Sequence, residues 1–257
     1  MRLFKQLAMA LAAFAVVPAN ATTIVDGNFS STSTTNGGTV PGGVCYSGAP
    51  DACVTLAGWT NTDGYTFVSN AATLGKSAFS GGTVTLDAFP SGPAGAPTLG
   101  QNYLAVDGVA FGAPRGTISQ SLSGLTVGDH YAVTFWQAAA QQSGYTGATT
   151  EQWQVTFSGT SGTQTGFSTL MSTPSQGTHA WNQVTLDFTA TTAIETLAFY
   201  ALGTPVGDPP FVLLDDISIS DVPEPSTLAA MGAGLVILMV KRRRRRGAAP
   251  ANTALAS

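Results

Sequence analysis

One stretch near the middle of the chain combines aromatic rings with amide side chains. Sugar recognition commonly uses rings as stacking platforms, with polar side chains around them that bond the hydroxyl groups. These residue types occur together at Trp136, Gln137, Gln141 and Tyr145. Trp136 falls on the opposite face of its predicted strand from Phe135. We predict a sugar-binding site at the four residues, and the alternative is a solvated loop beside an ordinary sheet face.

Carboxylates could also carry a hydrolytic reaction. The Gly-x-Ser-x-Gly, His-Glu-x-x-His and P-loop motifs are all missing from the chain. Glycoside hydrolysis needs two positioned carboxylates, and no spacing singles out a pair that includes Glu151 or Glu195. Asp215 and Asp216 are adjacent, so on a regular strand they point to opposite faces. The sequence therefore disfavours an enzyme, and the alternative is a polysaccharide hydrolase with an unrecognised site.

Residues 1–21 have the three parts of a secretory signal peptide, which we expect to be helical. A positively charged start precedes an apolar run over 7–17, and Ala19-Asn20-Ala21 supplies a small-x-small cleavage site. The apolar run is shorter than the roughly 20 residues that a transmembrane helix needs. We therefore expect the mature chain to begin near Thr22 and to be exported.

The C-terminal region has the pattern of a stop-transfer segment. A Pro-Glu-Pro turn precedes an apolar segment over 228–240, which becomes long enough to span a bilayer with Ser226, Thr227 and the first basic side chains. A basic cluster follows, and under the positive-inside rule it stays in the cytoplasm. Its members are Lys241, Arg242, Arg243, Arg244, Arg245 and Arg246. Because the cluster has no acidic partners nearby, we expect a transmembrane helix here rather than a soluble core helix.

Together these features resemble the PEP-CTERM sorting signal over residues 222–246. The three parts occur in the family's order: Val222, Pro223, Glu224 and Pro225, then the apolar segment, then the basic cluster. The resemblance implies an exosortase partner, a transpeptidase-like membrane enzyme of bacteria that make exopolysaccharide, which removes the tail near Pro-Glu-Pro. It also implies passage through the inner membrane to the cell surface or the extracellular matrix. The family's tail usually ends at the basic cluster, whereas residues 247–257 follow it here as an expected flexible tail.

Removal of both ends changes the charge of the protein. Between Thr22 and Val222 the chain has 13 acidic residues and only 2 basic ones, Lys76 and Arg115, for a formal charge of −11. Such a chain repels the phosphate backbone of nucleic acids. Nucleic-acid binding is therefore excluded, and the arginine run of the tail would mislead a search for a DNA-binding patch.

The two cysteines, Cys45 and Cys53, lie close together in a chain expected to be exported. A catalytic cysteine needs a base, and the two histidines, His130 and His179, have no motif context. Oxidising compartments favour disulfides between such neighbours. We therefore predict a disulfide that closes the loop 46–52, in preference to a metal site or a reactive thiol.

Short segments in which apolar and polar residues alternate recur through the mature chain and predict strands. The candidates are Ile24–Phe29, Tyr65–Ser69, Thr83–Phe89, Asn102–Asp107, Thr117–Leu122, Tyr131–Trp136, Gln152–Phe157, Val184–Thr189, Leu197–Phe199 and Phe211–Ile219. Without helical periodicity between them, a parallel α/β fold is excluded. We predict one all-β domain over 22–221 in which two sheets pack as a sandwich.

Three segments of the domain resemble galactose-binding-like jelly rolls. Ile24–Phe29 looks like their N-terminal strand, Ile118–Leu122 with Gly128–Phe135 looks like a middle strand pair, and Leu213–Ile219 is similar to the terminal strand. The resemblance implies a two-sheet jelly-roll sandwich. The family includes carbohydrate-binding modules and wall-associated proteins, so glycan binding follows only by analogy.

The same resemblance implies a structural Ca²⁺ between the first and last strands. Oxygen ligands suit this ion, and Asp215 matches the family's acidic position, with the backbone near Gly27 and Asn28 as companions. The first-strand motif of the family carries an acid where this chain has Ser30. The expected metal residues are therefore Asn28 and Asp215, and no cofactor is required.

These observations predict an exported surface or matrix protein, sorted by an exosortase, that binds exopolysaccharide or another glycan without turning it over. One alternative is a purely structural or protein-binding extracellular component, whose polar faces keep an acidic domain soluble. The other is the hydrolase described above. An exposed ring beside polar groups favours binding, and a convergent pair of carboxylates would favour catalysis.

Overall fold

The computed structural model describes residues 22–36, 44–45, 52–62, 66–70, 85–98, 101–108, 117–222, 234–235 and 237–239. The predicted signal peptide, the Pro-Glu-Pro turn and the basic cluster lie outside the described residues. Positions 234–235 and 237–239 are helical. In the part of the chain that the structure describes, no helix has the length and apolar character needed to cross a membrane.

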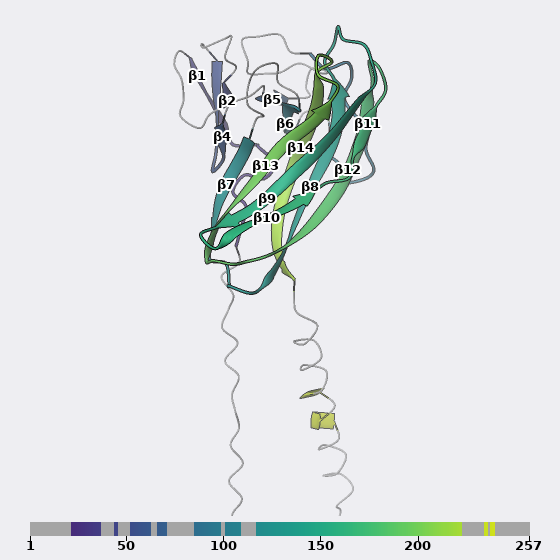
Figure 1. Ribbon diagram of the computed structural model, residues 1–257. Helices are drawn as coiled ribbons and strands as arrows, with labels where there is room; N and C mark the ends of the chain where they lie inside the picture. Colours follow the sequence, from purple (N-terminus) through teal and green to yellow (C-terminus); the bar gives the residue numbers. More distant parts are fainter. Residues whose placement is uncertain are drawn as a thin grey trace, which may run out of the picture.

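The described part of the chain between residues 32 and 222 is built mainly from antiparallel strands joined by turns and loops (Figure 1). The strands are β1 (Thr32–Asn36), β2 (Val44–Cys45), β3 (Ala52–Leu56), β4 (Thr60–Thr62), β5 (Thr66–Asn70), β6 (Asn102–Asp107), β7 (Thr117–Ser123), β8 (His130–Gln141), β9 (Thr149–Gly159), β10 (Gly162–Phe167), β11 (Met171–Thr173), β12 (Thr178–Thr189), β13 (Ile194–Thr204) and β14 (Pro210–Val222). Seven of the predicted segments lie within or overlap β5, β6, β7, β8, β9, β12 and β13, and the predicted Phe211–Ile219 lies within β14.

Two large sheets pack face to face, as predicted (Figure 1). The six-stranded sheet has the order β10-β9-β13-β7-β4, with β11 also paired to β9. The five-stranded sheet has the order β12-β8-β14-β6-β5. Strands β1, β3 and β2 form a separate small sheet in the order β1-β3-β2. Strand β14 pairs with both β8 and β6, so the last strand of the domain is central in its sheet.

The main core lies between the two large sheets. Alternate residues of β8, including Val133 and Phe135, point inward, while Thr134 and Trp136 point to the outer face of the sheet. Phe199 of β13 packs edge-on against Phe135 and Trp153, with ring centroids 5.1 and 6.0 Å apart. The period-two pattern of the sequence thus places its large side chains between the sheets.

A second apolar cluster lies on the outer face of the five-stranded sheet. Its floor consists of strand residues, and residues 85–98, here called the covering segment, pack over it through Leu86, Phe89 and Ala96. The buried strand members are Phe67, Tyr103, Ala105, Ala138, Ala140, Trp181, Phe211 and Leu213. The predicted strand Thr83–Phe89 is wrong for the described residues 85–89, where Leu86 forms only an isolated bridge with Gln142.

The predicted first strand, Ile24–Phe29, is also wrong, because this stretch turns instead of extending. Asp26 and Phe29 have φ values of 50° and 51°, and the Phe29 N–H donates to the Asp26 carbonyl over 3.1 Å. The Asp26 carboxylate accepts hydrogen bonds from the Ser30 hydroxyl at 3.1 Å and the Ser31 N–H at 3.0 Å. Aspartate favours such turns because its side chain replaces a strand partner for the local backbone.

The backbone of the small sheet bears on the predicted disulfide. Strands β2 and β3 pair in antiparallel register, with Cys45 directly opposite Cys53. Directly opposed residues have Cβ atoms about 4.5–5.5 Å apart, close to the separation that a disulfide needs. The cysteine side chains lie outside the described residues, so the bond stays a prediction.

We expect mass spectrometry after alkylation without a reductant to find Cys45 and Cys53 unmodified, and both modified after reduction. Closing so short a loop is expected to stabilise the domain by about 2–3 kcal/mol. Reduction should lower the melting temperature accordingly. Alkylation of both thiols in the unreduced, exported protein would contradict the prediction.

Candidate functional site

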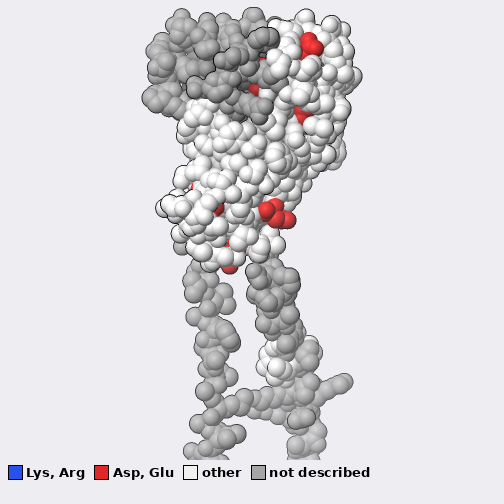
Figure 2. Space-filling view, in the orientation of Figure 1, with Lys and Arg blue, Asp and Glu red and all other residues white. Residues whose placement is uncertain are grey.

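The described surface carries acidic side chains but no basic ones. None of the described residues is Lys or Arg, and Figure 2 shows acidic side chains as isolated patches separated by uncharged surface. Serine, threonine and glutamine side chains dominate the exposed strand positions. A ligand for the uncharged areas between these patches would be neutral and rich in hydroxyl groups, because those areas offer polar side chains without charge.

The structure places the four predicted sugar-binding residues in three different environments. Trp136 is half-buried on the outer face of the five-stranded sheet and packs against the second apolar cluster. Gln137 and Gln141 are fully buried on the opposite face of β8, between the sheets. Tyr145 is 38% exposed in the connection that follows β8. The four side chains therefore do not converge on one ligand.

Both buried amides bond to the chain itself. The Gln141 side chain donates to the Gly147 carbonyl at 3.1 Å and accepts from the Gln176 N–H at 2.6 Å. The Gln137 side chain donates to the Thr169 carbonyl at 3.0 Å, and its oxygen is buried without a hydrogen-bond partner. These glutamines connect β8 to the loops at one end of the sandwich, which is a structural role.

The two aromatic members are also separated along the chain. The end of β8 at Gln141 is five steps along the extended strand from Trp136, a distance of about 17 Å at the usual rise per residue. Tyr145 follows in a turn in which its N–H donates to the Gln142 carbonyl at 3.3 Å. One small sugar therefore cannot stack on Trp136 and bond to the Tyr145 turn at the same time.

Aromatic rings do converge beneath the covering segment. Phe89, Tyr103 and Trp181 form a three-ring cluster with centroids 5.7, 6.2 and 6.0 Å apart. The Trp181 N–H donates to the Ser91 carbonyl at 2.7 Å, which holds the covering segment on β12. The Asp87 N–H similarly donates to the Gln141 carbonyl at 3.0 Å. The sheet, through these bonds, fixes the position of the Phe89 ring.

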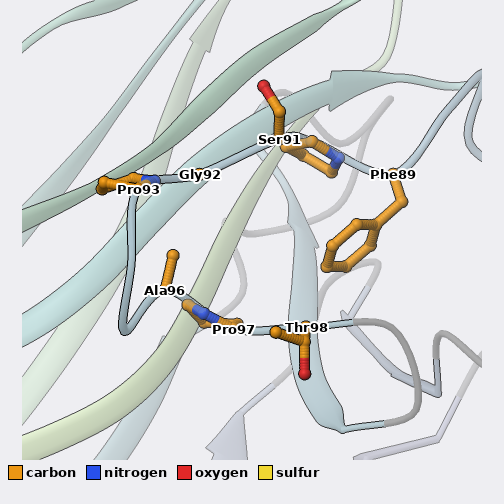
Figure 3. A pocket seen from close by; sticks show the side chains of 8 residues that line it. Phe89, Ser91, Gly92, Pro93, Ala96, Pro97 and Thr98 are labelled. Atoms are coloured by element: carbon orange, nitrogen blue, oxygen red, sulfur yellow. The ribbon is translucent and has the colours of Figure 1, made fainter.

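The covering segment lines an open hollow of about 460 Å³ (Figure 3). The ring of Phe89 extends from the backbone into this space, whereas the hydroxyl groups of Ser91 and Thr98, two further lining residues, point away from the ring in opposite directions. The Thr98 hydroxyl donates to the Gln101 side-chain oxygen at 3.1 Å. The remaining lining residues are small or ring-constrained: Pro90, Gly92, Pro93, Ala96 and Pro97. The lining thus offers one aromatic face, two hydroxyls and no charged side chain.

Trp181 has a polar group that its own chain does not satisfy. The residue is 2% exposed, and its indole N–H is buried without a hydrogen-bond partner. A methyl group added at Gly92 would lie 2.9 Å from the Trp181 Cβ, so the lining of the hollow touches this tryptophan directly. Buried donors without an acceptor cost free energy, and functional sites are among the places where they occur.

A second polar site joins the beginning of the domain to its last strand. A bulge in β14 between Asp215 and Ser218 breaks the alternation that was expected to place Asp215 and Asp216 on opposite faces. Burial, the charge of Asp216 and that of Asp26 together raise the pKa of Asp215 to about 8. Burial also raises the pKa of Asp216. Three carboxyl groups thus lie close enough to interact.

The donor chemistry here fits an oxygen-binding cation in part. Asp26 supplies the acid that the resemblance expected at Ser30, whereas the exposed Asn28 side chain accepts a hydrogen bond from the Ser30 N–H. The Gly27 carbonyl is already bonded to the Ile217 N–H at 2.9 Å. Among the described residues no group of three or more His, Cys, Asp or Glu side chains has an arrangement that could hold a metal ion.

Glu151 lies between the sheets near the buried glutamines. It is 0% exposed, and its carboxylate accepts hydrogen bonds from the hydroxyls of Thr149 and Thr173, the latter at 2.8 Å. Burial raises the pKa of Glu151, while the two hydroxyl groups act in the opposite direction. A carboxyl group enclosed in this way cannot reach a polysaccharide.

The comparison with protein families concerns the C-terminal end. Residues 221–246 match the model of the PEP-CTERM protein-sorting motif. The chain carries a PEP-CTERM sorting motif. The match confirms the resemblance to the PEP-CTERM sorting signal. The motif indicates an exported protein that is sorted to the cell surface, and it implies processing by an exosortase.

No curated protein matches this chain. Solved structures similar to it include the xylan-binding CBM22-1 domain of Xyn10C from Paenibacillus barcinonensis, with 16% identity over 65% of this chain and 87% of that one and a TM-score of 0.36. A CBM4 domain has 11% identity over 77% and 99%, also at 0.36. The enzymatically active domain of a bacteriophage CBA120 tailspike has 12% identity over 65% of this chain, at 0.36, and the alignment spans only 20% of its length.

The sequence did not predict the contact between Phe89 and Trp181 at the hollow, nor the role of Asp26 beside Asp215. Phe89 and Trp181 were not predicted to meet, because the covering segment had been assigned in part to a strand. The residues from Pro90 to Pro97 contain three prolines and two glycines, a composition that marks a loop rather than a strand. Asp26 was missed because its stretch was expected to be extended.

Proposed function

We propose that the mature domain of this PEP-CTERM protein is a non-catalytic glycan-binding module. Its ligand is a neutral polysaccharide of the cell surface or extracellular matrix, with the exopolysaccharide of the producing cell as the prime candidate. The observation that carries the proposal is the uncharged hollow of the covering segment, whose lining includes the Phe89 ring and the hydroxyl-bearing residues Ser91 and Thr98. An aromatic face and adjacent hydroxyls are the groups that bind a pyranose ring.

The surroundings of the hollow support this assignment. Trp181 and Tyr103 pack against Phe89, so the ring is held in place before a ligand arrives and loses little freedom on binding. The covering segment is fixed by backbone hydrogen bonds to β12 and to the end of β8. Delivery to the cell surface through the sorting motif would bring this hollow into contact with polysaccharide.

Burial of the acidic residues favours binding over hydrolysis. Glu151, Glu195 and Asp215 are each at most 1% exposed. A glycosidase needs two carboxyl groups that face the scissile bond, about 5 to 10 Å apart. These three residues have no access to a polysaccharide chain, so the hydrolase alternative would have to use other acids.

Phe89→Ala in the full-length protein, purified in mild detergent, is expected to weaken binding to exopolysaccharide about tenfold, since a well-placed contact residue is worth more than 1 kcal/mol. Thr98→Val should weaken it less, because one hydroxyl contact is lost. Affinity gel electrophoresis measures both effects. Val127→Ala, which shortens an exposed apolar side chain away from the hollow, serves as the control. Equal retardation of Phe89→Ala and wild type would contradict the site.

A further inference from the structure

The outer face of the six-stranded sheet carries a row of side chains in direct cross-strand register. Phe167 of β10 pairs with Gln154 of β9, Gln154 with Tyr200 of β13, and Tyr200 with Thr117 of β7. Paired residues of antiparallel strands point to the same side of a sheet. The neighbours Trp153, Val155 and Phe199 are buried in the core, which fixes the row on the outer face.

Both rings of the row are open to solvent. Phe167 is 52% exposed, and Tyr200 and Gln154 are half-buried. A single exposed aromatic residue is normal on a protein surface. Two rings that flank an amide in register are less easily explained as incidental exposure, because nothing in the core requires them.

The rest of this face is uncharged. Its outward positions on β9, β10, β13, β7 and β4 are mostly hydroxyl or amide side chains, and not one is acidic or basic: Thr150, Gln152, Thr156, Ser158, Thr163, Thr165, Thr196, Ala198, Leu202, Thr204, Ser119, Ser121, Ser123, Thr60 and Thr62. Ile194, at the start of β13, is the one large aliphatic side chain on this face that is mostly exposed. In Figure 1 the strands that carry them lie side by side. A binding surface for a protein partner is expected to contain a contiguous apolar patch. This face instead has two aromatic rings surrounded mainly by hydroxyl and amide side chains.

The spacing of the rings limits what can occupy them. Neighbouring strands lie about 4.8 Å apart, so Phe167 and Tyr200, two strands apart, are separated by roughly 10 Å across the sheet. That distance is suited to alternate pyranose units of an extended chain. Two such units could therefore stack on Phe167 and Tyr200, while the Gln154 amide bonds the hydroxyls of the unit between them.

We infer that the outer face of the six-stranded sheet is a second glycan-binding surface, which takes an extended, uncharged polysaccharide running across the strands along Phe167, Gln154 and Tyr200. This inference rests on the proposed function and adds a site on the opposite face of the sandwich from the covering segment. With a surface on each face, one protein molecule can bridge two polysaccharide chains.

The test uses the full-length protein in mild detergent, with hydroxyethyl cellulose, xylan and exopolysaccharide from the producing cells as probes. Phe167→Ala/Tyr200→Ala should weaken binding to at least one probe tenfold or more, and Phe167→Tyr/Tyr200→Phe, which keeps both rings, should bind as wild type. Val206→Ala removes exposed apolar area away from both faces and is the matched control. Thermal unfolding of each variant shows that the fold is retained, as expected for changes on an outer face.

The outcomes separate the two claims. If wild-type protein binds and the alanine double variant binds equally tightly while Phe89→Ala does not, the second surface is refuted and the proposed function stands. If the ring-retaining variant loses binding as much as the alanine variant, stacking on the two rings is refuted. If wild-type protein binds none of the three probes, both the second surface and the proposed function fail.

Discussion

Asp215→Asn is expected to raise the stability of the domain at pH 8 by on the order of 2 to 5 kcal/mol, measured in EDTA. The buried carboxyl of Asp215 has its pKa raised to about 8 in the folded protein, through burial and the charges of Asp216 and Asp26. In the unfolded chain the same group ionises near its usual value of about 3.9. Asparagine has the same shape, can accept the same hydrogen bond from the Asp216 N–H, and carries no charge.

The pH dependence follows from the sign of this shift. Between about pH 4 and pH 8 the folded state holds a proton on Asp215 that the unfolded state has released, so the free energy of unfolding of the wild-type domain falls as pH rises. Above pH 8 both states are ionised and the loss is complete. The Asn variant should lack this slope, and thermal unfolding between pH 4 and pH 9 measures it. Equal or lower stability of the variant at pH 8 would contradict the assignment.

The same titration tests the proposed Ca²⁺ at Asn28 and Asp215. An ion that binds the Asp215 carboxylate favours its ionised form and stabilises the folded state by mass action. Ca²⁺ should then raise the melting temperature of the wild-type protein at pH 8 and leave Asp215→Asn unchanged. Identical melting temperatures of the wild type in Ca²⁺ and in EDTA would contradict Ca²⁺ binding at Asn28 and Asp215.

Trp153→Ala is expected to destabilise the domain by about 3–5 kcal/mol, the usual range for removal of a buried large aromatic side chain. Trp153 is fully buried between the sheets and packs edge-on against Phe199. Its indole N–H donates to the Leu213 carbonyl at 3.1 Å, so the substitution also removes a hydrogen bond between the two sheets. The main core and the pairing of the two sheets should both weaken.

Thermal or urea unfolding by circular dichroism measures this effect, and Gln154→Ala is the matched control. Gln154 is the next residue of β9 but points to the outer face, where substitutions usually change stability by no more than about 0.5 kcal/mol. Trp153→Phe separates the two contributions, since it keeps most of the ring volume and loses only the N–H. A loss for Trp153→Ala no larger than that for Gln154→Ala would contradict the assigned core.

The architecture could be predicted from the sequence wherever alternation is strong. The inward side chains of β8, β9 and β13 alternate with threonine, glutamine and serine, and the two faces follow from period two alone. Trp153 shares a face of its strand with Val155 and Phe157, and all three lie in the core. The Asp26 turn could not be read in the same way, since the apolar residues around it mimic a strand while its carboxylate bonds Ser30 and Ser31.

The candidate sites were less accessible to sequence reasoning, because they depend on contacts between distant segments. Gln137 and Gln141 have the right chemistry for sugar binding, yet β8 turns both toward the interior, where loop backbone groups take up their amides. Phe89 and Trp181 are 92 residues apart in sequence, and only the path of the covering segment brings their rings together. The row from Phe167 to Tyr200 likewise requires the register of three strands, which alternation does not specify.

The most direct test of the account is isothermal titration of the domain spanning residues 22–222 with exopolysaccharide from the producing cells, in EDTA and in Ca²⁺. We expect the domain to bind the neutral polysaccharide saturably and to release no reducing sugar over the course of the titration. Absence of binding in both conditions would contradict the glycan-binding function and would favour a structural or protein-binding role for the sorted domain.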